Sequence, residues 1–471
     1  MWLIVLLLVA PPVFAQSAPP WANRPWTPTG DERPVLAEPW RDSGFRLDAA
    51  KTYSLAELID LAQRHNPDTR VAWERARAQA AALGVARSAL YPTLAAAALA
   101  RATRSDVLVD NAFVREQIRS AALTFDLTYL VLDFGGRAGR IDTARAETLA
   151  ANFAFNDIHR QVIFQVSDAY YRLLNASGQE DGASASLANA QAVQRAAEER
   201  LHNGLATLPD VLEARSAAAQ ADYELQAALG TTEIAVGDLA MALGAMPSTA
   251  LHVQPLSEVV QPDSIGTTID EAIDRAFAQR PDFMQQLAEI RAADARARET
   301  RSALYPTLNV RAQPGPQLLR GQRRPFPWAH SEGVMGWAGV SLDWTVFDGG
   351  ARSRALAEAQ ASAAATRARA ASVRDRIAND VWTAYSQLTT ALRRRTAASA
   401  LVDSAGQSYA AALESYNFGL RNLLDVTAAQ RTLAEARSAD VLARTQALSA
   451  LATLAFQTGD SIQSTVRIPR P

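Results

Sequence analysis

The sequence predicts an α+β protein made of two similar halves, each with a pair of strands and a long helical hairpin. The octapeptide Arg-Ser-Ala-Leu-Tyr-Pro-Thr-Leu occurs at Arg87–Leu94 and again at Arg301–Leu308, 214 residues downstream. Each copy leads into segments in which apolar and polar residues alternate, and a long proline-free stretch follows in each half. A repeat on this scale indicates one structural unit used twice.

Composition excludes several classes of function. The 471 residues carry a formal net charge of −2, so no nucleic-acid partner is expected. There is no cysteine, which excludes disulfides, thiolate metal sites and a cysteine nucleophile. The five histidines are scattered without metal-binding spacing. We therefore expect no enzyme, no metal site and no cofactor.

The order of segments follows from the repeat. Residues 1–15 are expected to be a signal peptide with a small-residue cleavage site ending at Ala15, followed by a proline-rich segment over 16–50. The first repeat covers 51–243, a connector covers 244–267, the second repeat covers 268–459 and a tail covers 460–471. No later apolar run approaches the roughly 20 residues that a membrane-spanning helix needs. Any membrane crossing must therefore use strands.

Each repeat begins with a short helix. Ser54 with Glu57, and Thr268 with Glu271, have the spacing of capping boxes. Each short helix should end before a proline, at Pro67 and Pro281, and a second helix should follow.

The strands are expected at about 91–101 and 120–131 in the first repeat and at about 305–313 and 336–347 in the second. Polar loops are expected between them, at Thr103–Arg119 and Pro314–Glu332. The alternation fits either membrane strands or the half-buried strands of a soluble sheet. Four strands cannot close a membrane barrel, so membrane strands would require several chains to share one barrel.

Glycines follow the second strand of each half, at Gly135, Gly136, Gly349 and Gly350. We expect them to let the chain change from strand to helix without a Cβ clash. A phosphate-binding loop is the alternative, but the spacing matches neither common glycine-rich fingerprint.

Long helical hairpins complete the halves, over about 140–243 and 351–457. The apolar residues of their first helices are spaced as in a coiled-coil seam: Val162, Val166, Ala169 and Leu173, then Ile377, Val381, Ala384 and Leu388. Gly204 and Gly419 suit the ends of these helices, and Asp210 and Asp425 suit the first turn of the returning helices.

This order of elements, with its Tyr-Pro-Thr-Leu strand starts, Asp-Gly-Gly-Ala-Arg exit and two Gly-Leu turns, resembles the TolC family of outer-membrane efflux channels over about Ser54–Gly459. The resemblance implies a homotrimer in which three chains give four strands each to a twelve-stranded outer-membrane barrel. A long periplasmic α-helical coiled-coil barrel would continue below it. The implied function is an exit duct of a tripartite efflux pump or type I secretion system in a Gram-negative bacterium.

The resemblance also implies roles for residues near the hairpin turns. Asp210, Tyr416 and Arg421 would form a periplasmic gate, and Asp425 would form a single constriction ring because Ala428 stands at the second acidic position. Gly204, Leu205, Gly419 and Leu420 would dock a periplasmic adaptor protein. An inner-membrane pump, such as an RND or ABC transporter, and outer-membrane lipid would be the other partners. The alternative is a periplasmic coiled-coil adaptor or scaffold without a pore.

Overall fold

The computed structural model describes residues 47–460, except residues 49, 250 and 262–263. The expected signal peptide over 1–15, nearly all of the proline-rich segment and the tail over 461–471 lie outside the described residues.

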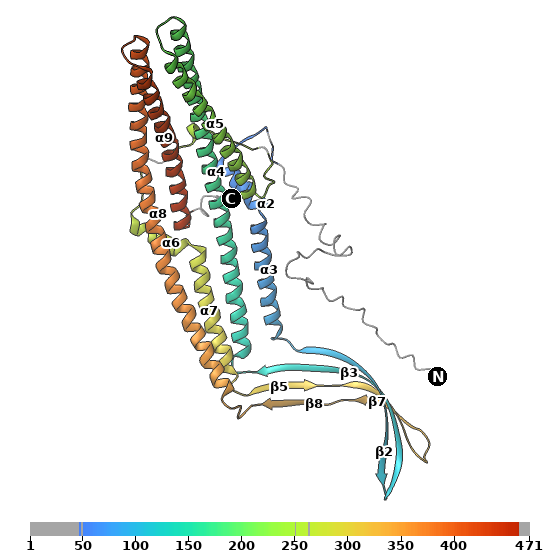
Figure 1. The fold of residues 1–471 in the computed structure, drawn as a ribbon. Coiled ribbons are helices and arrows are strands. Elements are labelled where there is room, and N and C mark those ends of the chain that lie inside the picture. Colours follow the sequence, from blue (N-terminus) through green and yellow to red (C-terminus); the bar gives the residue numbers. More distant parts are fainter. Residues whose placement is uncertain (1–46, 49, 250, 262–263, 461–471) are drawn as a thin grey trace, which may run out of the picture. The chain divides into compact units, whose positions relative to one another are not determined.

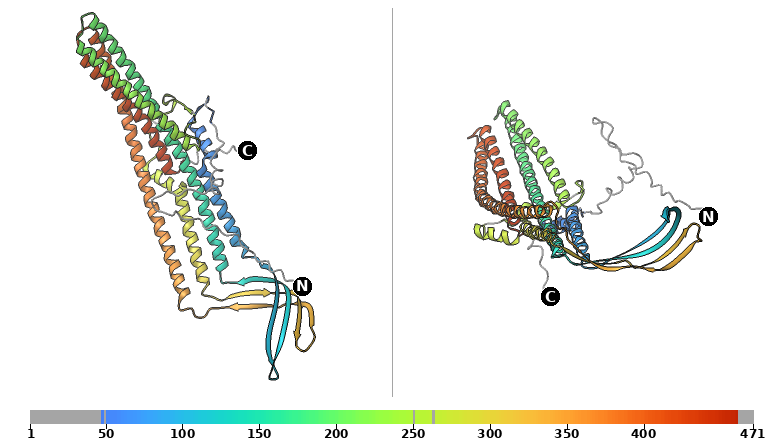
Figure 2. Two further views of the ribbon diagram at one scale, coloured as in Figure 1. Left: turned by 45° about the vertical axis from the view of Figure 1, so that its right-hand side comes forward. Right: turned by 90° about the horizontal axis from the view of Figure 1, so that it is seen from below.

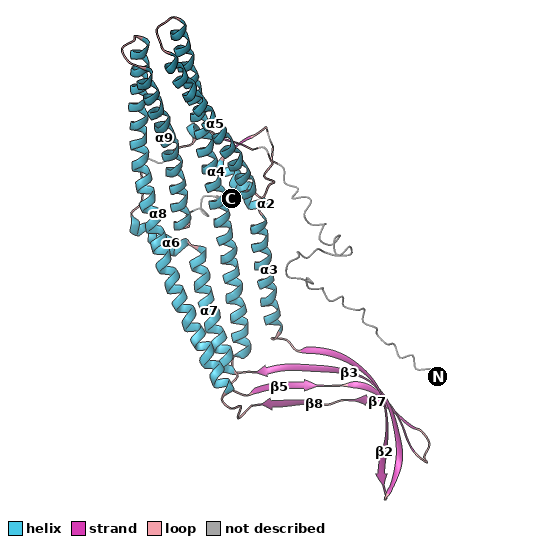
Figure 3. Cartoon of the chain, in the orientation of Figure 1, coloured by secondary structure: helices cyan, strands magenta, loops and turns pink. Residues whose placement is uncertain are grey.

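Helices account for most of the described chain, and they occur in pairs of matching length (Figure 1, Figure 3). The short helices α2 and α6 have 11 residues each, α3 and α7 have 22 each, and α4 and α8 have 67 each. In the part of the chain that the structure describes, no helix is long and apolar enough to cross a membrane. The bounds are α2 Leu55–His65, α3 Pro67–Ser88, α4 Gly136–His202, α5 Leu208–Ala242, α6 Ile269–Gln279, α7 Pro281–Ser302, α8 Ala351–Asn417 and α9 Leu423–Thr458.

Helix boundaries fall where the sequence chemistry puts them. Both predicted capping boxes are present: the Ser54 and Thr268 side chains accept hydrogen bonds from the backbone N–H groups of Glu57 and Glu271. Helices α3 and α7 begin at Pro67 and Pro281, where a missing N–H costs nothing.

The long helices pack as a layer in the order α3, α4, α7, α8, and α5 and α9 return along α4 and α8 (Figure 2). All eight predicted seam residues of α4 and α8 are buried. Alanine is frequent at the other buried positions, which allows close approach of the helices. In the region expected to connect the halves, β4 (His252–Val253) pairs in parallel with β1 (Thr52–Tyr53) and η1 covers Leu256–Glu258.

The large sheet has four extended arms. The first two are β2 (Thr93–Val109) and β3 (Ala112–Leu132), and the other two are each interrupted: β5 (Thr307–Ala312) with β6 (Gly315–Arg323), and β7 (Ala329–Met335) with β8 (Ala338–Asp343). The register of β3 on β5 continues without a shift onto β6, from Leu127 opposite Ala312 to Ala122 opposite Gln317. Each interrupted pair therefore behaves as one long strand.

The expected polar loops at Thr103–Arg119 and Pro314–Glu332 are wrong, because strands continue through most of both segments. Strands β2 and β3 meet at a two-residue turn, Asp110-Asn111, in which both residues have positive φ, 47° and 66°. Asp and Asn tolerate that conformation, so a tight hairpin forms where a long loop was expected. The second hairpin turns between Arg323 and Ala329.

The two faces of the sheet differ in polarity. Leu94 lies opposite Leu127, which lies opposite Ala312 and then Ala338, so one face is apolar across all four arms. On the other face Gln313 donates to Asp126 at 2.6 Å, and Asn309 donates to Asp343 at 3.1 Å. The sheet therefore has one apolar face and one hydrogen-bonded polar face.

Candidate functional site at the hairpin tips

The turns that join α4 to α5 and α8 to α9 have the same backbone geometry. Gly204 and Gly419 have φ of 72° and 76°, in the left-handed region that glycine adopts without strain. The N–H of Leu205 donates to the Arg200 carbonyl at 2.7 Å, and that of Leu420 donates to the Ser415 carbonyl at 2.8 Å. These are Schellman-type ends, and they project Leu205 and Leu420, which are 68% and 79% exposed.

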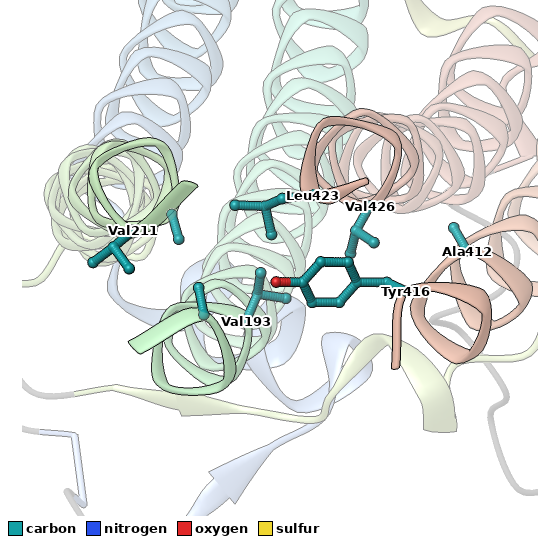
Figure 4. Close-up of a cluster of buried hydrophobic side chains, with 8 residues drawn as sticks. Val193, Val211, Ala412, Tyr416, Leu423 and Val426 are labelled. Carbon is teal, nitrogen blue, oxygen red and sulfur yellow. The ribbon is translucent and has the colours of Figure 1, made fainter. Parts of the chain in front are cut away.

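A small apolar core lies beneath the two turns, and both hairpins contribute to it (Figure 4). Each of the four helices α4, α5, α8 and α9 provides two buried residues: Val193, Ala197, Val211, Ala214, Ala412, Tyr416, Leu423 and Val426. Separating the hairpins would expose this core to water, which is unfavourable for apolar surface.

Tyr416, a predicted gate residue, belongs to this core and is 5% exposed. Its hydroxyl is buried and has no hydrogen-bond partner within the described chain. Burial raises the pKa of the Tyr416 phenol, with Asp210 acting in the same direction and Arg200 opposing it. The side chain therefore serves as apolar packing in this conformation.

Arg200, which the sequence analysis did not single out, is the arginine that contacts Tyr416. Its guanidinium lies 4.6 Å from the centre of the Tyr416 ring, and its Nη1 donates to the Tyr416 carbonyl at 2.8 Å. The contact joins the end of α4 to the end of α8. The only sequence signal was a basic residue in the last turn of a helix, which usually indicates a local end effect.

Asp210, the second predicted gate residue, is used locally. Its Oδ2 accepts from the Thr207 N–H at 2.8 Å and from the Thr207 hydroxyl at 2.7 Å, so it closes a capping box at the start of α5. The Thr207 hydroxyl, followed by the Thr207 N–H, holds the pKa of Asp210 below its usual value, and the Arg200 charge adds to this.

Arg421, the third predicted gate residue, lies exposed in the turn before α9. It makes no hydrogen bond or ion pair with any residue the structure describes, and within one chain it is not brought to Asp210. Its guanidinium is thus free to meet another chain.

Asp425 lies in the first turn of α9, where its N–H donates to the Asn422 side chain at 2.9 Å. Its carboxylate has no partner within residues 47–460. Ala428, one turn later, is exposed.

At the opposite ends of α4 and α8, the predicted glycines have two different roles. Gly135, Gly349 and Gly350 have φ of 96°, 66° and 87°, as the change from strand to helix requires. Gly136 was expected to do the same, but the other left-handed residue there is Phe134, with φ of 48°. A Cβ on Gly136 would lie 2.5 Å from the Ser302 hydroxyl, so its lack of a side chain permits close packing instead.

Two arginines complete these junctions, and the sequence analysis missed their role. Arg137 donates to the carbonyls of Ala89 and Leu130 at 3.3 and 2.9 Å. In the second half Arg352 donates to the Ala303 carbonyl at 3.1 Å and to the Thr345 carbonyl. Each arginine joins the end of a helix, α3 or α7, to the backbone near the end of a strand, β3 or β8, which fixes the angle between sheet and helices.

No group of acidic residues or histidines in the described region could hold a metal ion. An amphipathic four-arm sheet continuous with two long helical hairpins is the architecture of a channel-forming protein.

Comparison with known proteins gives the family. The sequence matches the outer membrane efflux protein family over residues 58–245 and 272–460, and the chain belongs to that family. This places it in the outer membrane, extending into the periplasm, and decides against the alternative of a periplasmic adaptor or scaffold without a pore.

Individual relatives agree with this assignment. The chain is 29% identical to Protein CyaE of Bordetella pertussis over 53% of its own length and 48% of that protein. It is 26% identical to the pyoverdine export outer membrane protein OpmQ of Pseudomonas aeruginosa, over 56% of each chain. The matches thus span about half the length of these relatives. The crystal structure of VceC from Vibrio cholerae has the same fold, with a TM-score of 0.71, 20% identity and coverage of 86% of this chain and 96% of that one.

Proposed function

We propose that three copies of this chain form a twelve-stranded barrel in the outer membrane, continuous with an α-helical barrel in the periplasm. The assembly serves as the exit duct of a tripartite efflux pump or type I secretion system. A periplasmic adaptor binds its tips, and an inner-membrane pump of the RND or ABC class supplies the cargo. In this proposal the two tandem repeats give the helical wall six similar hairpins.

The observation that carries the proposal is the open amphipathic sheet. Within the described residues β2 pairs with β3 alone, and the arm made of β7 and β8 likewise pairs on one side. Unpaired strand edges cannot be left in lipid, because each backbone N–H or C=O group without a hydrogen-bond partner there costs at least about 1–3 kcal/mol. Closing four-arm sheets edge to edge satisfies both edges, puts the apolar face toward lipid and lines the pore with the polar face.

The tips support a gate that forms between chains. Arg421 is exposed and has no partner among the described residues of its own chain, while the Asp210 carboxylate is ionised and partly accessible next to Thr207. An Arg421–Asp210 contact between neighbouring copies is a charge-assisted hydrogen bond that a partner can break. The half-buried Asp425 adds one acidic ring near it.

The exposed leucines support docking of the adaptor. Leu205 and Leu420 stand at the two turns, next to glycines whose positive φ fixes their direction. Further apolar side chains are exposed beside them: Leu208, Leu212, Phe418 and Leu424. An exposed apolar patch of this kind indicates a protein-binding surface.

The experiment that tests the duct is purification of the mature chain in detergent, followed by native mass spectrometry and planar-bilayer recording. The expected result is a particle of three chains that inserts and conducts. A monomer that stays soluble without detergent and gives no conductance would contradict the proposal.

The gate has its own test in the same bilayers. Arg421→Ser removes the contact between chains and should raise single-channel conductance. Arg195→Ser, which replaces an exposed arginine of α4 before the turn, should leave the conductance unchanged. Equal conductance of the two variants would remove Arg421 from the gate.

A further inference from the structure

Arg200 joins the two hairpins of one chain at their tips. Its Nη1 donates to the Tyr416 carbonyl at 2.8 Å and to the Asn417 carbonyl at 3.5 Å, and both carbonyls belong to the last turn of α8. Among the described residues of the two tips, 190–220 and 405–429, the hydrogen bonds that connect one hairpin to the other all come from this side chain. Within these ranges the two tips are otherwise joined by apolar packing, and the next hydrogen bond between the hairpins runs from Gln430 Nε2 to the Ser186 carbonyl at 3.2 Å.

The chemistry of the contact makes it stronger than an ordinary surface hydrogen bond. The last carbonyls of an α-helix carry partial negative charge and lack helical partners, so a guanidinium satisfies them and interacts favourably with the helix dipole. The same guanidinium lies on the face of the buried Tyr416 ring, at 4.6 Å from its centre. Burial of the ring and of the Arg200 Nε keeps water from competing with these contacts.

Arg200 Nε is also buried and finds no acceptor among the described residues, and the buried Tyr416 hydroxyl likewise has no hydrogen-bond partner there. Two unsatisfied buried polar groups oppose the contact, because each loses its hydrogen bonds to water. The favourable hydrogen bonds and cation–π contact of Arg200 are therefore partly offset by the two unsatisfied groups. A contact with this small net stability can be made and broken.

The two tips make this contact once, from the first half to the second. The residue equivalent to Arg200 in the second half is Ser415, whose side chain is too short to reach across, and the residue equivalent to Tyr416 is Leu201. In the assembly proposed above, this gives three such contacts, each within one chain, alternating with the Arg421 contacts between chains.

We propose that Arg200 is a positioning residue of the gate, which holds the α8–α9 tip against the α4–α5 tip and so sets the width of the duct end. This inference rests on the proposed function, but the contact itself can be tested without it. When the hydrogen bonds from Arg200 break, the carbonyls at the end of α8 lose the cation that offsets their partial negative charge. The second hairpin then separates from the first.

The test compares Arg200→Ala with the matched control Arg195→Ala, which removes an exposed arginine from the same helix. Hydrogen exchange is measured at the amides of residues 418–420, which close the end of α8. Losing a charge-assisted hydrogen bond and a cation–π contact should speed exchange there by about tenfold or more in Arg200→Ala. The control should exchange like the wild type. Equal exchange in the two variants would overturn the proposal.

Bilayer recording then separates this inference from the proposed function. Arg200→Ala should raise conductance relative to wild type and to Arg195→Ala. If the wild type does not conduct, the proposed duct is wrong, and the exchange result alone decides whether Arg200 holds the two tips together. If the wild type conducts and Arg200→Ala has the same conductance, only the gate role of Arg200 is wrong.

A second variant keeps the test decisive if the alanine variant fails to assemble. Arg200→Lys keeps the charge but loses the planar group that stacks on the ring while donating to carbonyls. Its exchange rate should fall between those of the wild type and the alanine variant. Exchange identical to wild type would show that any cation suffices and would overturn the specific geometry.

Discussion

The strand-to-helix junctions and the hairpin tips lie at opposite ends of the same long helices. The two halves of the chain match at the junctions and differ at the tips. At the junctions, Arg137 and Arg352 bind carbonyls at equivalent positions, Leu130 and Thr345 among them. At the tips, Arg200 in one half has Ser415 as its counterpart. A junction redirects its own chain, so each half needs the same device. A contact between two tips needs one donor and one acceptor, so the halves must differ.

The junction arginines should give the largest effect on stability. Arg352→Ala removes hydrogen bonds to the Ala303 and Thr345 carbonyls and the ion pair with Asp348 at 2.6 Å. Hydrogen bonds to charged groups contribute about 1.5–3 kcal/mol each, so we expect a loss of about 3 kcal/mol. Thermal unfolding in detergent, followed by circular dichroism, measures it.

Arg354→Ala, two residues further along α8, is the control, because Arg354 is exposed and its side chain makes no hydrogen bond within the described residues. Arg137→Ala should resemble Arg352→Ala. If only one of the two variants destabilises the protein, the two junctions are not equivalent, and the contrast between matching junctions and differing tips is wrong.

Gly139 should give the next largest effect, because it marks a place where the junctions do differ. A Cβ there would lie 2.8 Å from the backbone nitrogen of Glu299 in α7, whereas the equivalent residue of α8 is the exposed Arg354. Helix α4 is inside the layer and α8 is at its edge. Gly139→Ala should cost about 1–3 kcal/mol by overpacking, measured by the same unfolding experiment. Gly84→Ala in α3, where a Cβ meets nothing within 4 Å, should be neutral or stabilising.

These junctions and tips also mark the limits of sequence-based prediction. Capping boxes, prolines and the seam from Val162 to Leu173 act within a few residues, so the helices could be predicted closely. The strands were predicted too short, because polar residues such as Arg104 and Glu116 suggested a loop, although they lie on paired strands. Arg200 could not be found, because its role depends on how two distant hairpins pack.

Asp210 should have a smaller effect, of about 1 kcal/mol, typical for loss of a capping interaction. Asp210→Ala removes the two hydrogen bonds from Thr207, and Asp425→Ala, at the equivalent position of the second tip, removes a carboxylate that has no partner among the described residues. Hydrogen exchange at the first-turn amides of α5 should therefore rise in Asp210→Ala. Exchange at the first-turn amides of α9 should not rise in Asp425→Ala.

The effect of Asp210 should depend on pH in a defined direction. Its folded-state pKa is lowered, so its contribution is fully present above the unfolded value of about 3.9 and is lost as pH falls below that value toward the folded pKa. The difference between wild type and Asp210→Ala should thus be constant near neutral pH and shrink below about pH 4. A difference that shrinks between pH 8 and pH 6 would point to another titrating group.

Tyr416→Phe should give the smallest effect and says most about how the tips work. The hydroxyl has no partner within the described chain, and the ring and carbonyl that contact Arg200 both remain in phenylalanine. Stability should change by less than about 0.5 kcal/mol, with a slight gain favoured because a buried unsatisfied hydroxyl is removed. Tyr416→Ala, by contrast, removes the ring from the core and should loosen the tip as strongly as Arg200→Ala. If phenylalanine instead raises conductance in bilayers, the hydroxyl must bind a neighbouring chain, and the gate then depends on contacts between chains at this residue as well as at Arg421.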